Sequence, residues 1–177
     1  MNTIASNAGR IARATGEAFE LALDRYHRQL EAEGRAYIRR VGAPVAVLGK
    51  VSRDARGRHI FRAAWDGFQG VDFTGHTSRG VHVAIEAKTH AGPGAWDCGI
   101  DPSGEASENG AIQVRQWVEL RRVGLCGGIA LIMLRAWGRE WAIPPGRLAE
   151  HVRQKGRRTV RPDEINAIGT RGLEWMR

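Results

Sequence analysis

Residues 81–88 read VHVAIEAK, and this stretch decides the class of fold. Apolar residues stand at every second position from Val81, which predicts a β-strand whose side chains alternate between two faces. Glu86 and Lys88 lie two positions apart, so their side chains leave the same face of the strand. A carboxylate and an ammonium are unfavourable inside a sheet unless they pair or bind something. The stretch therefore predicts both a strand of the central sheet and a functional site.

The segments on either side of this strand predict helices and further strands. Helical spacing of apolar residues predicts helices over 11–33, 111–123 and 145–154. Short apolar runs predict strands over 44–48, 71–73, 128–134 and 140–143, of which the last two are expected to form a hairpin. Glycines are expected to end the first helix at Gly34, to make a turn over 75–80 and to close a last helical turn near Gly169. This order predicts a single α/β domain over 1–177, with a mixed central sheet flanked by helices.

Two segments lack the periodicity of a core element. Residues 89–110 are rich in Gly, Pro, Ser and Asp, which predicts a long flexible loop. Residues 46–70 predict a protruding basic stalk, because cationic and aromatic side chains suited to phosphates and unstacked bases are interleaved there. The candidate DNA contacts of the stalk are Lys50, Arg53, Arg56, Arg58, Arg62 and Trp65. Arg157 and Arg158 form a second candidate DNA contact. An ordinary basic hairpin and solvated surface charge are the alternative interpretations.

The composition is that of one globular domain with an affinity for polyanions. The chain has 177 residues, 42% of them hydrophobic, so it is large and apolar enough for a packed core. Its 27 Lys and Arg against 19 Asp and Glu give a net charge of +8, which favours nucleic acid as a partner. The predominance of Arg suits bidentate phosphate contacts, although GC-rich coding would produce it equally well.

Cysteine usage and hydropathy exclude several other classes of protein. Two cysteines in a chain of this length make no disulfide framework, no zinc motif is readable, and Cys126 is expected to be a small buried hydrophobe. No apolar stretch approaches the ~20 residues of a membrane span, and the N-terminus has no apolar signal core. We expect a soluble, cytoplasmic protein without a membrane partner.

Asp72 supplies a second carboxylate to the expected site. It lies on the predicted strand 71–73, and an antiparallel hairpin would bring it beside Glu86. Two carboxylates and a backbone carbonyl make a hard-oxygen site suited to Mg²⁺, which polarises a phosphate and lowers the pKa of a bound water. Lys88 can then position that water and stabilise the developing charge. These are the parts needed for phosphodiester hydrolysis, although an isolated E-x-K strand is often only a solvated face.

The longer stretches around these residues resemble the RecU-type Holliday junction resolvases of the PD-(D/E)xK nuclease superfamily. The similar segments are VDFTGHTSRGVHVAIEAKTH (71–90), RQWVELRRVGLCGGIALIML (115–134), WAIPPGRL (141–148) and KGRRTVRPDEI (155–165), with GEAFE (16–20) on the first helix. They occur in the order of that family and at plausible spacing. The resemblance covers most of residues 10–168, and EAKTH with the downstream glutamine helix and GGIALIML is its most specific part.

The resemblance implies a restriction-endonuclease-like fold and a set of site residues. Asp72, Glu86 and the Ala87 carbonyl would hold Mg²⁺, for which Mn²⁺ is the expected substitute, and Lys88 would orient the attacking water. Glu20 would be the carboxylate of the first helix near the metal. Gln116 would be the glutamine on the helix after the catalytic strand. Gln113, one turn earlier, is the alternative to Gln116.

The resemblance further implies an endonuclease that resolves four-way DNA junctions in recombination and repair. The stalk of residues 46–70 would enter the junction centre. Nicking two strands symmetrically calls for a homodimer with two active sites related by a two-fold axis. The alternatives are another PD-(D/E)xK nuclease that acts on duplex DNA, and a non-catalytic junction-binding recombination protein.

Overall fold

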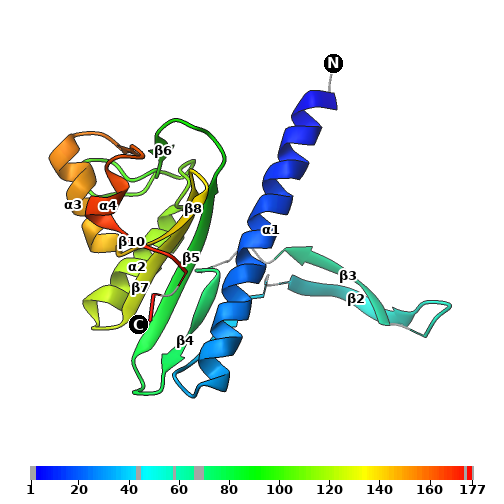
Figure 1. Ribbon diagram of the computed structural model, residues 1–177. Coiled ribbons are helices and arrows are strands. Elements are labelled where there is room, and N and C mark those ends of the chain that lie inside the picture. Colours follow the sequence, from blue (N-terminus) through cyan, green and yellow to red (C-terminus); the bar gives the residue numbers. More distant parts are fainter. Residues whose placement is uncertain (1–2, 43–44, 58, 66–69, 174, 177) are drawn as a thin grey trace.

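The protein is represented by a computed structural model that describes residues 3–42, 45–57, 59–65, 70–173 and 175–176. Within these ranges, the side chains of residues 3–9, 11–13, 45–51 and 59–65 are not described. The chain forms a mixed α/β structure built on a central sheet (Figure 1).

The central sheet has six strands in the order β1-β4-β5-β7-β8-β10. Its strands are β1 (Ala36–Arg40), β4 (Phe73–Thr77), β5 (His82–His90), β7 (Ile129–Ala136), β8 (Arg139–Ile143) and β10 (Thr170–Arg171). The β5–β7 pair is parallel and all other pairs are antiparallel, so the sheet is mixed. The predicted mixed central sheet flanked by helices is confirmed.

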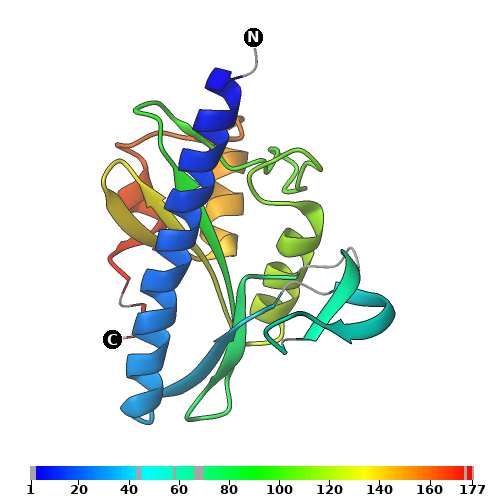
Figure 2. The ribbon, with the colours of Figure 1, turned by 90° about the vertical axis from the view of Figure 1, so that its right-hand side faces the viewer.

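The first helix, α1 (Thr3–Ala32), packs along one face of this sheet (Figure 2). Phe19, Leu23 and Leu30 recur at helical spacing and are buried in one core cluster with the α1-facing residues of the sheet. Gly34 has a φ of 66°, and the Arg35 N–H donates to the Leu30 carbonyl, which closes the last turn. The helix begins earlier than the predicted residue 11, while the predicted stop is confirmed.

The central strand β5 is buried on both faces. Val83 and Ile85 lie in the cluster with α1, whereas Ala84 lies in a second cluster on the opposite face. The alternation predicted from the sequence is therefore confirmed. Because β5 and β7 are parallel, the chain must cross over between them, and the helix α2 (Val114–Leu125) makes this crossover on the second face. The predicted helix over 111–123 starts three residues too early.

The turn predicted over 75–80 begins too early, because Gly75 lies inside β4. The β4 strand continues through Gly75 to Thr77, and only then does the chain turn into β5. A Cβ atom at position 75 would lie 2.0 Å from the Tyr37 carbonyl oxygen of β1. This glycine therefore serves the close approach of two strands rather than a turn. The strand predicted over 71–73 is displaced accordingly, and Asp72 precedes β4.

Strands β2 (Val45–Arg53) and β3 (His59–Trp65) form a separate antiparallel hairpin that extends away from the central sheet (Figures 1 and 2). Its turn is closed by a bond from the Gly57 N–H to the Asp54 carbonyl, 2.9 Å long, and Gly57 has a φ of 74°. The strand predicted over 44–48 corresponds to the first half of β2, although Pro44 lies outside the described residues. The role of this hairpin as a stalk stays a prediction.

The segment predicted as a long loop is packed against the second face of the sheet. It carries β6 (Trp96–Asp97), which pairs with β9 (Thr159–Val160). Trp96, Cys98 and Ile100 are buried there. Flexibility of this segment stays a prediction.

The helices of the C-terminal region have nearly the bounds predicted from the sequence. The helix α3 (Pro145–Lys155) begins at the predicted residue and ends at Gly156, whose φ is 64°. The short helix α4 (Ile165–Ile168) ends at Gly169, as predicted. Among the described helices, none has the length and apolar character required to cross a membrane.

Candidate active site

Asp72 and Glu86 lie side by side at the junction of β4 and β5. The register pairs Phe73 with Ile85, so the next residues along each strand, Asp72 and Glu86, come opposite one another. The Asp72 carboxylate accepts a hydrogen bond of 2.8 Å from the Ala87 N–H, which fixes it against β5. The structure thus brings together the two carboxylates that the sequence singled out.

The Glu86 carboxylate is buried and only half satisfied. Its side chain is 1% exposed, and its Oε1 atom lies 2.6 Å from the Lys88 Nζ. Its Oε2 atom accepts no hydrogen bond from a donor among the described residues, and the carboxylate lies within hydrogen-bonding reach of the Asp72 carboxylate. Burial, and to a lesser extent the nearby Asp72 carboxylate, raises the pKa of Glu86 to about 8 against the opposing charge of Lys88. A carboxylate in this position is stabilised by a cation, and Lys88 is the cation now beside it.

Gln116 holds the ammonium of Lys88 from the other side. The Lys88 Nζ donates to the Gln116 Oε1 at 3.2 Å, and the Gln113 N–H donates to the same oxygen at 3.0 Å. Gln116 is buried on the first turn of α2, whereas Gln113 is exposed and precedes the helix. Of the two glutamines left open by the sequence, Gln116 is the one that contacts Lys88.

Glu20 approaches the same place from α1. It forms an ion pair with Arg40, at the end of β1. Its pKa is raised by partial burial and by the negative charge of Asp72, while the charges of Arg40 and Lys88 oppose this shift. These electrostatic interactions group Glu20 with Asp72 and Lys88, and its role near a metal stays a prediction.

The Ala87 carbonyl lies on the same side of β5 as Asp72. The N–H and C=O of one strand residue leave the strand in the same lateral direction. Because the Ala87 N–H points to Asp72, its carbonyl also points past the end of β4, where the sheet pairing with β5 has stopped. This geometry adds a third oxygen to the two carboxylates.

These oxygens fit a divalent metal ion. Within the described ranges, no three His, Cys, Asp or Glu side chains converge as a closed metal cage. Asp72, Glu86 and the Ala87 carbonyl form an open set instead, which suits Mg²⁺ because this ion keeps several waters and binds substrate phosphates. The unpartnered Glu86 Oε2 is the observation that favours such an ion.

The predicted DNA contacts are dispersed and only partly visible. Arg53 and Arg56 are exposed near the tip of the β2–β3 hairpin. The side chains of Lys50, Arg62 and Trp65, and all of Arg58, lie outside the described residues.

Arg157 and Arg158 are engaged within the chain. The Arg157 guanidinium lies 2.5 and 2.6 Å from the two Glu164 carboxylate oxygens. Arg158 pairs with Asp97 at 2.6 Å. Both therefore tie the C-terminal region together, and a contact with DNA stays a prediction.

An exposed row of rings, to which Tyr37 contributes, lies on the same face as Glu86 and was not expected from the sequence. The register pairs Tyr37 with His76 and His76 with His82 across β1, β4 and β5. The Tyr37 and His76 rings stack with centroids 5.7 Å apart, and the Arg39 guanidinium lies 4.1 Å from the Tyr37 ring. The helix α2 covers β5 and β7 on this face, and Tyr37, His76 and His82 are exposed beside the helix. The alternation of Tyr37 and Arg39 with buried Ala36 and Ile38 is the signal that would have found this row.

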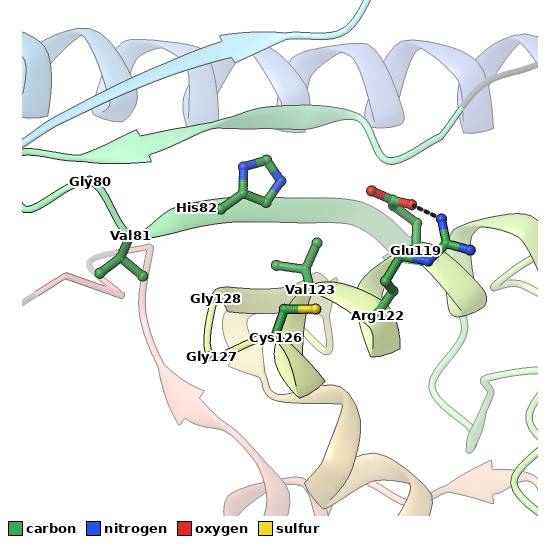
Figure 3. Close-up of a pocket in the computed structure, with 9 residues that line it drawn as sticks. All are labelled: Gly80, Val81, His82, Glu119, Arg122, Val123, Cys126, Gly127 and Gly128. Carbon is green, nitrogen blue, oxygen red and sulfur yellow. Dashed lines mark ion pairs between the residues drawn. The ribbon is translucent and has the colours of Figure 1, made fainter.

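A cavity of about 500 Å³ lies at the opposite end of β5 from Lys88 (Figure 3). His82, Val123 and Cys126 line it, and Glu119 forms an ion pair of 3.8 Å with Arg122 at its rim. Cys126 is exposed, so its prediction as a buried hydrophobe is wrong, because it caps the C-terminal end of α2 where the chain turns outward. The buried cysteine is Cys98, and burial raises the pKa of its thiol to about 11.

No protein-family model matches the chain, and no curated protein matches it. The function is therefore argued from the residues of the site.

Proposed function

We propose that this protein is a metal-dependent endonuclease of the RecU type, with a restriction-endonuclease-like fold, that resolves four-way DNA junctions. The observation that carries the proposal is the buried Glu86 carboxylate, with one unpartnered oxygen, between the partly exposed Asp72 and Lys88. A buried carboxylate next to a second carboxylate is ionised when cations offset both charges, and the Lys88 ammonium offsets only one of them. Mg²⁺ meets that requirement, and Mn²⁺ is the expected substitute.

The residues of the site have separate tasks in phosphodiester hydrolysis. Bound Mg²⁺ would supply Lewis-acid activation of the scissile phosphate and of a water molecule. Asp72, Glu86 and the Ala87 carbonyl would hold it, with Glu20 at the periphery. Lys88 would then turn from Glu86 toward the attacking water and the developing negative charge. Gln116 restricts the directions in which the Lys88 ammonium can point, because its side-chain oxygen is fixed by the Gln113 N–H.

Two surface features support DNA as the substrate. The row of Tyr37, His76 and His82 lies on the same face of the sheet as Glu86, four residues along β4 and β5 from the Asp72–Glu86 pair. The β2–β3 hairpin begins five residues after Arg40, which pairs with Phe73 next to Asp72. It extends away from the sheet and carries Arg53 and Arg56 of the predicted stalk (Figure 2). A basic hairpin near the Asp72–Glu86 pair and an aromatic row further along the sheet suit a substrate whose arms diverge from a centre.

The reaction itself supports a homodimer. Resolution of a four-way junction requires two cuts in strands of like polarity, so two copies related by a two-fold axis are the simplest assembly. Each copy would contribute one Asp72–Glu86 site.

A cleavage comparison tests the proposal. A labelled four-way junction and a linear duplex with the sequence of two of its arms are incubated with the protein, with Mg²⁺ or with a chelator. We expect paired nicks near the junction centre only with the metal, and much slower cutting of the duplex. Equal cutting of both substrates would favour the duplex nuclease, and metal-dependent cleavage of neither would contradict the assignment of an enzyme.

A further inference from the structure

The turn between β7 and β8 holds a tryptophan in a backbone conformation that bulky residues rarely adopt. Ala136 pairs with Arg139, so only Trp137 and Gly138 connect the two strands. Trp137 has a φ of 51°, the only positive φ at a non-glycine residue within the described ranges. Asn, Asp or Gly is the usual residue at this place in a two-residue hairpin. An outlier of this kind points to a function that the indole performs.

The indole of Trp137 is fixed by two contacts. Its Nε1–H donates to the Gly94 carbonyl at 2.9 Å. Its ring meets the edge of the His90 ring at a centroid distance of 5.8 Å. His90 also lies at the end of β5, two residues after Lys88 and roughly 7 Å further along the strand. The indole is therefore held close to the strand that carries the proposed active site.

The fixed indole forms a wall of an open cavity of about 630 Å³. Thr15, Pro93 and Pro162 complete walls that are mainly apolar. Arg139 and Arg161, both exposed, adjoin the lining residues Gly138 and Pro162 in the sequence. Arg135 also lines the cavity, paired with Glu140 at 3.1 Å. A flat aromatic wall with exposed arginines on residues next to the lining suits a nucleobase and its neighbouring phosphates.

We propose that this cavity is a nucleobase subsite, in which an unpaired base of the DNA stacks on Trp137 while Arg139 and Arg161 contact adjacent phosphates. The proposal rests on the proposed function, because it takes the DNA strand from the Asp72–Glu86 site past the end of β5. On this proposal, the positive φ of Trp137 is tolerated because the turn holds the indole face toward the base.

Two substitutions at Trp137 separate stacking from a structural role. Trp137→Asn suits a positive φ and keeps the turn, but it removes the aromatic face. Trp137→Phe keeps an aromatic face but loses the hydrogen bond to Gly94. Binding of an oligothymidylate is measured in a chelator, together with the melting temperature of each variant. Leu125→Asn, at an 82% exposed position on α2, is the control.

We expect Trp137→Asn to weaken oligothymidylate binding roughly five- to hundredfold, as for one base that no longer stacks, and also to lower the melting temperature, because it loses the hydrogen bond to Gly94 and the packing of the indole on the core. Trp137→Phe should retain most of the affinity, and Leu125→Asn all of it. If Trp137 only anchors the loop at Gly94, Trp137→Phe should lower the melting temperature while neither substitution changes affinity, and the proposal is overturned.

A crosslinking measurement on the unaltered protein decides the question should Trp137→Asn fail to fold. An oligothymidylate with one 5-iodouracil is irradiated with the full chain, and the attached residue is identified. Attachment at Trp137 or His90 supports the subsite, and attachment only outside the cavity overturns it. Attachment at Trp137 in a protein that cuts no junction would leave the subsite standing while the proposed nuclease fails.

Discussion

At the residue scale, the chemistry depends on the contrast between Glu86 and Lys88. Both leave the same face of β5, yet Glu86 is almost fully buried and Lys88 reaches Gln116. The sequence predicted this pair because a strand with period two fixes which side chains share a face. It left the choice between Gln116 and Gln113 open, since that choice depends on where α2 begins. The structure starts α2 after Gln113, which places Gln116 against Lys88.

The substitution Asp72→Asn should abolish cleavage and preserve junction binding. It removes a charge that the proposed metal needs, while its oxygen can still accept the hydrogen bond from the Ala87 N–H. We expect the rate to fall by at least roughly a thousandfold, since loss of metal activation raises the barrier by several kcal/mol. Cleavage rates and junction affinity in Ca²⁺ are measured on both proteins. Cutting by the variant at a rate near that of the unaltered protein would show that Asp72 is not a ligand.

The substitution Lys88→Ala should lower turnover far more than affinity. One partly buried ammonium adds little to a broad DNA surface, but it faces the developing charge, and losing such a group costs roughly 10²–10³ in rate. Gln116→Ala should give a smaller loss of the same kind, because Gln116 acts through Lys88. Single-turnover rates and dissociation constants separate the two effects. A large loss of affinity with normal turnover would make Lys88 a plain phosphate contact.

At the element scale, what the sequence predicted depended on local periodicity. Strand β5 and helix α3 were found because their apolar residues repeat, whereas β1 was missed because its five residues follow a helix closely and end in two arginines. The turn predicted at Gly75 was wrong, because the sequence does not distinguish a glycine required by the close approach of a neighbouring strand from a glycine required by a turn. Asp72 and Glu86 were still matched correctly, because the pairing of β4 with β5 is local.

The packing of α1 on β4 makes the stability of the protein sensitive to mild acid. His27 is 1% exposed, neither ring nitrogen has a hydrogen-bond partner among the described residues, and its ring meets Phe73 edge-on at 4.9 Å. Burial lowers the pKa of His27 to about 4, against an opposing effect of Asp24. The unfolded chain therefore binds a proton at His27 below about pH 6.5 while the folded chain does not, so stability is lost as the pH falls from 6.5 toward 4.

The substitution His27→Leu should remove this acid sensitivity. Between pH 7.5 and 5 the unaltered protein should lose about 2 kcal/mol more unfolding free energy than the variant, because the opposite contribution of Glu86, whose pKa is raised to about 8, is common to both proteins. Glu164, whose pKa is lowered to about 2 mainly by the Arg161 N–H and the Arg157 guanidinium, contributes its own loss only below about pH 4.5. Urea unfolding at the two pH values gives the comparison. An equal pH dependence in both proteins would contradict the assignment to His27.

The β2–β3 hairpin should select for branched DNA. The register places Leu48 opposite Arg62, so replacing residues 49–61 with a short Gly-Ser turn shortens the hairpin without altering the central sheet. Junction affinity should fall, and the slope of log affinity against log salt should decrease by about 0.9 for each phosphate that the shortened protein no longer neutralises. Duplex binding should change much less. The double substitution of Arg53 and Arg56 by Gln is the control that keeps the hairpin length. An equal fall in both affinities would make the hairpin a general basic patch.

At the scale of the whole molecule, the proposed site lies where three parts of the fold meet. The start of β4 and the neighbouring part of β5 supply Asp72 and Glu86, α1 supplies Glu20, and α2 supplies Gln116. The net charge of +8 favours DNA over the whole surface, while the position of the hairpin near this site gives that attraction a direction. This meeting of distant segments could not be predicted from periodicity, and only the resemblance of the longer stretches suggested it.

The most direct test of the central claim is cleavage of a four-way junction by the purified protein beside its Glu86→Gln variant. Both proteins are compared at equal junction occupancy, with Mg²⁺ and with Ca²⁺. The unaltered protein should nick the junction in Mg²⁺ only, and Glu86→Gln should bind it but leave it uncut, since the variant lacks the charge that holds the metal. Equal nicking by the two proteins, or no nicking by the unaltered protein in Mg²⁺ or Mn²⁺, would contradict the claim that Asp72, Glu86 and Lys88 form a metal-dependent nuclease site.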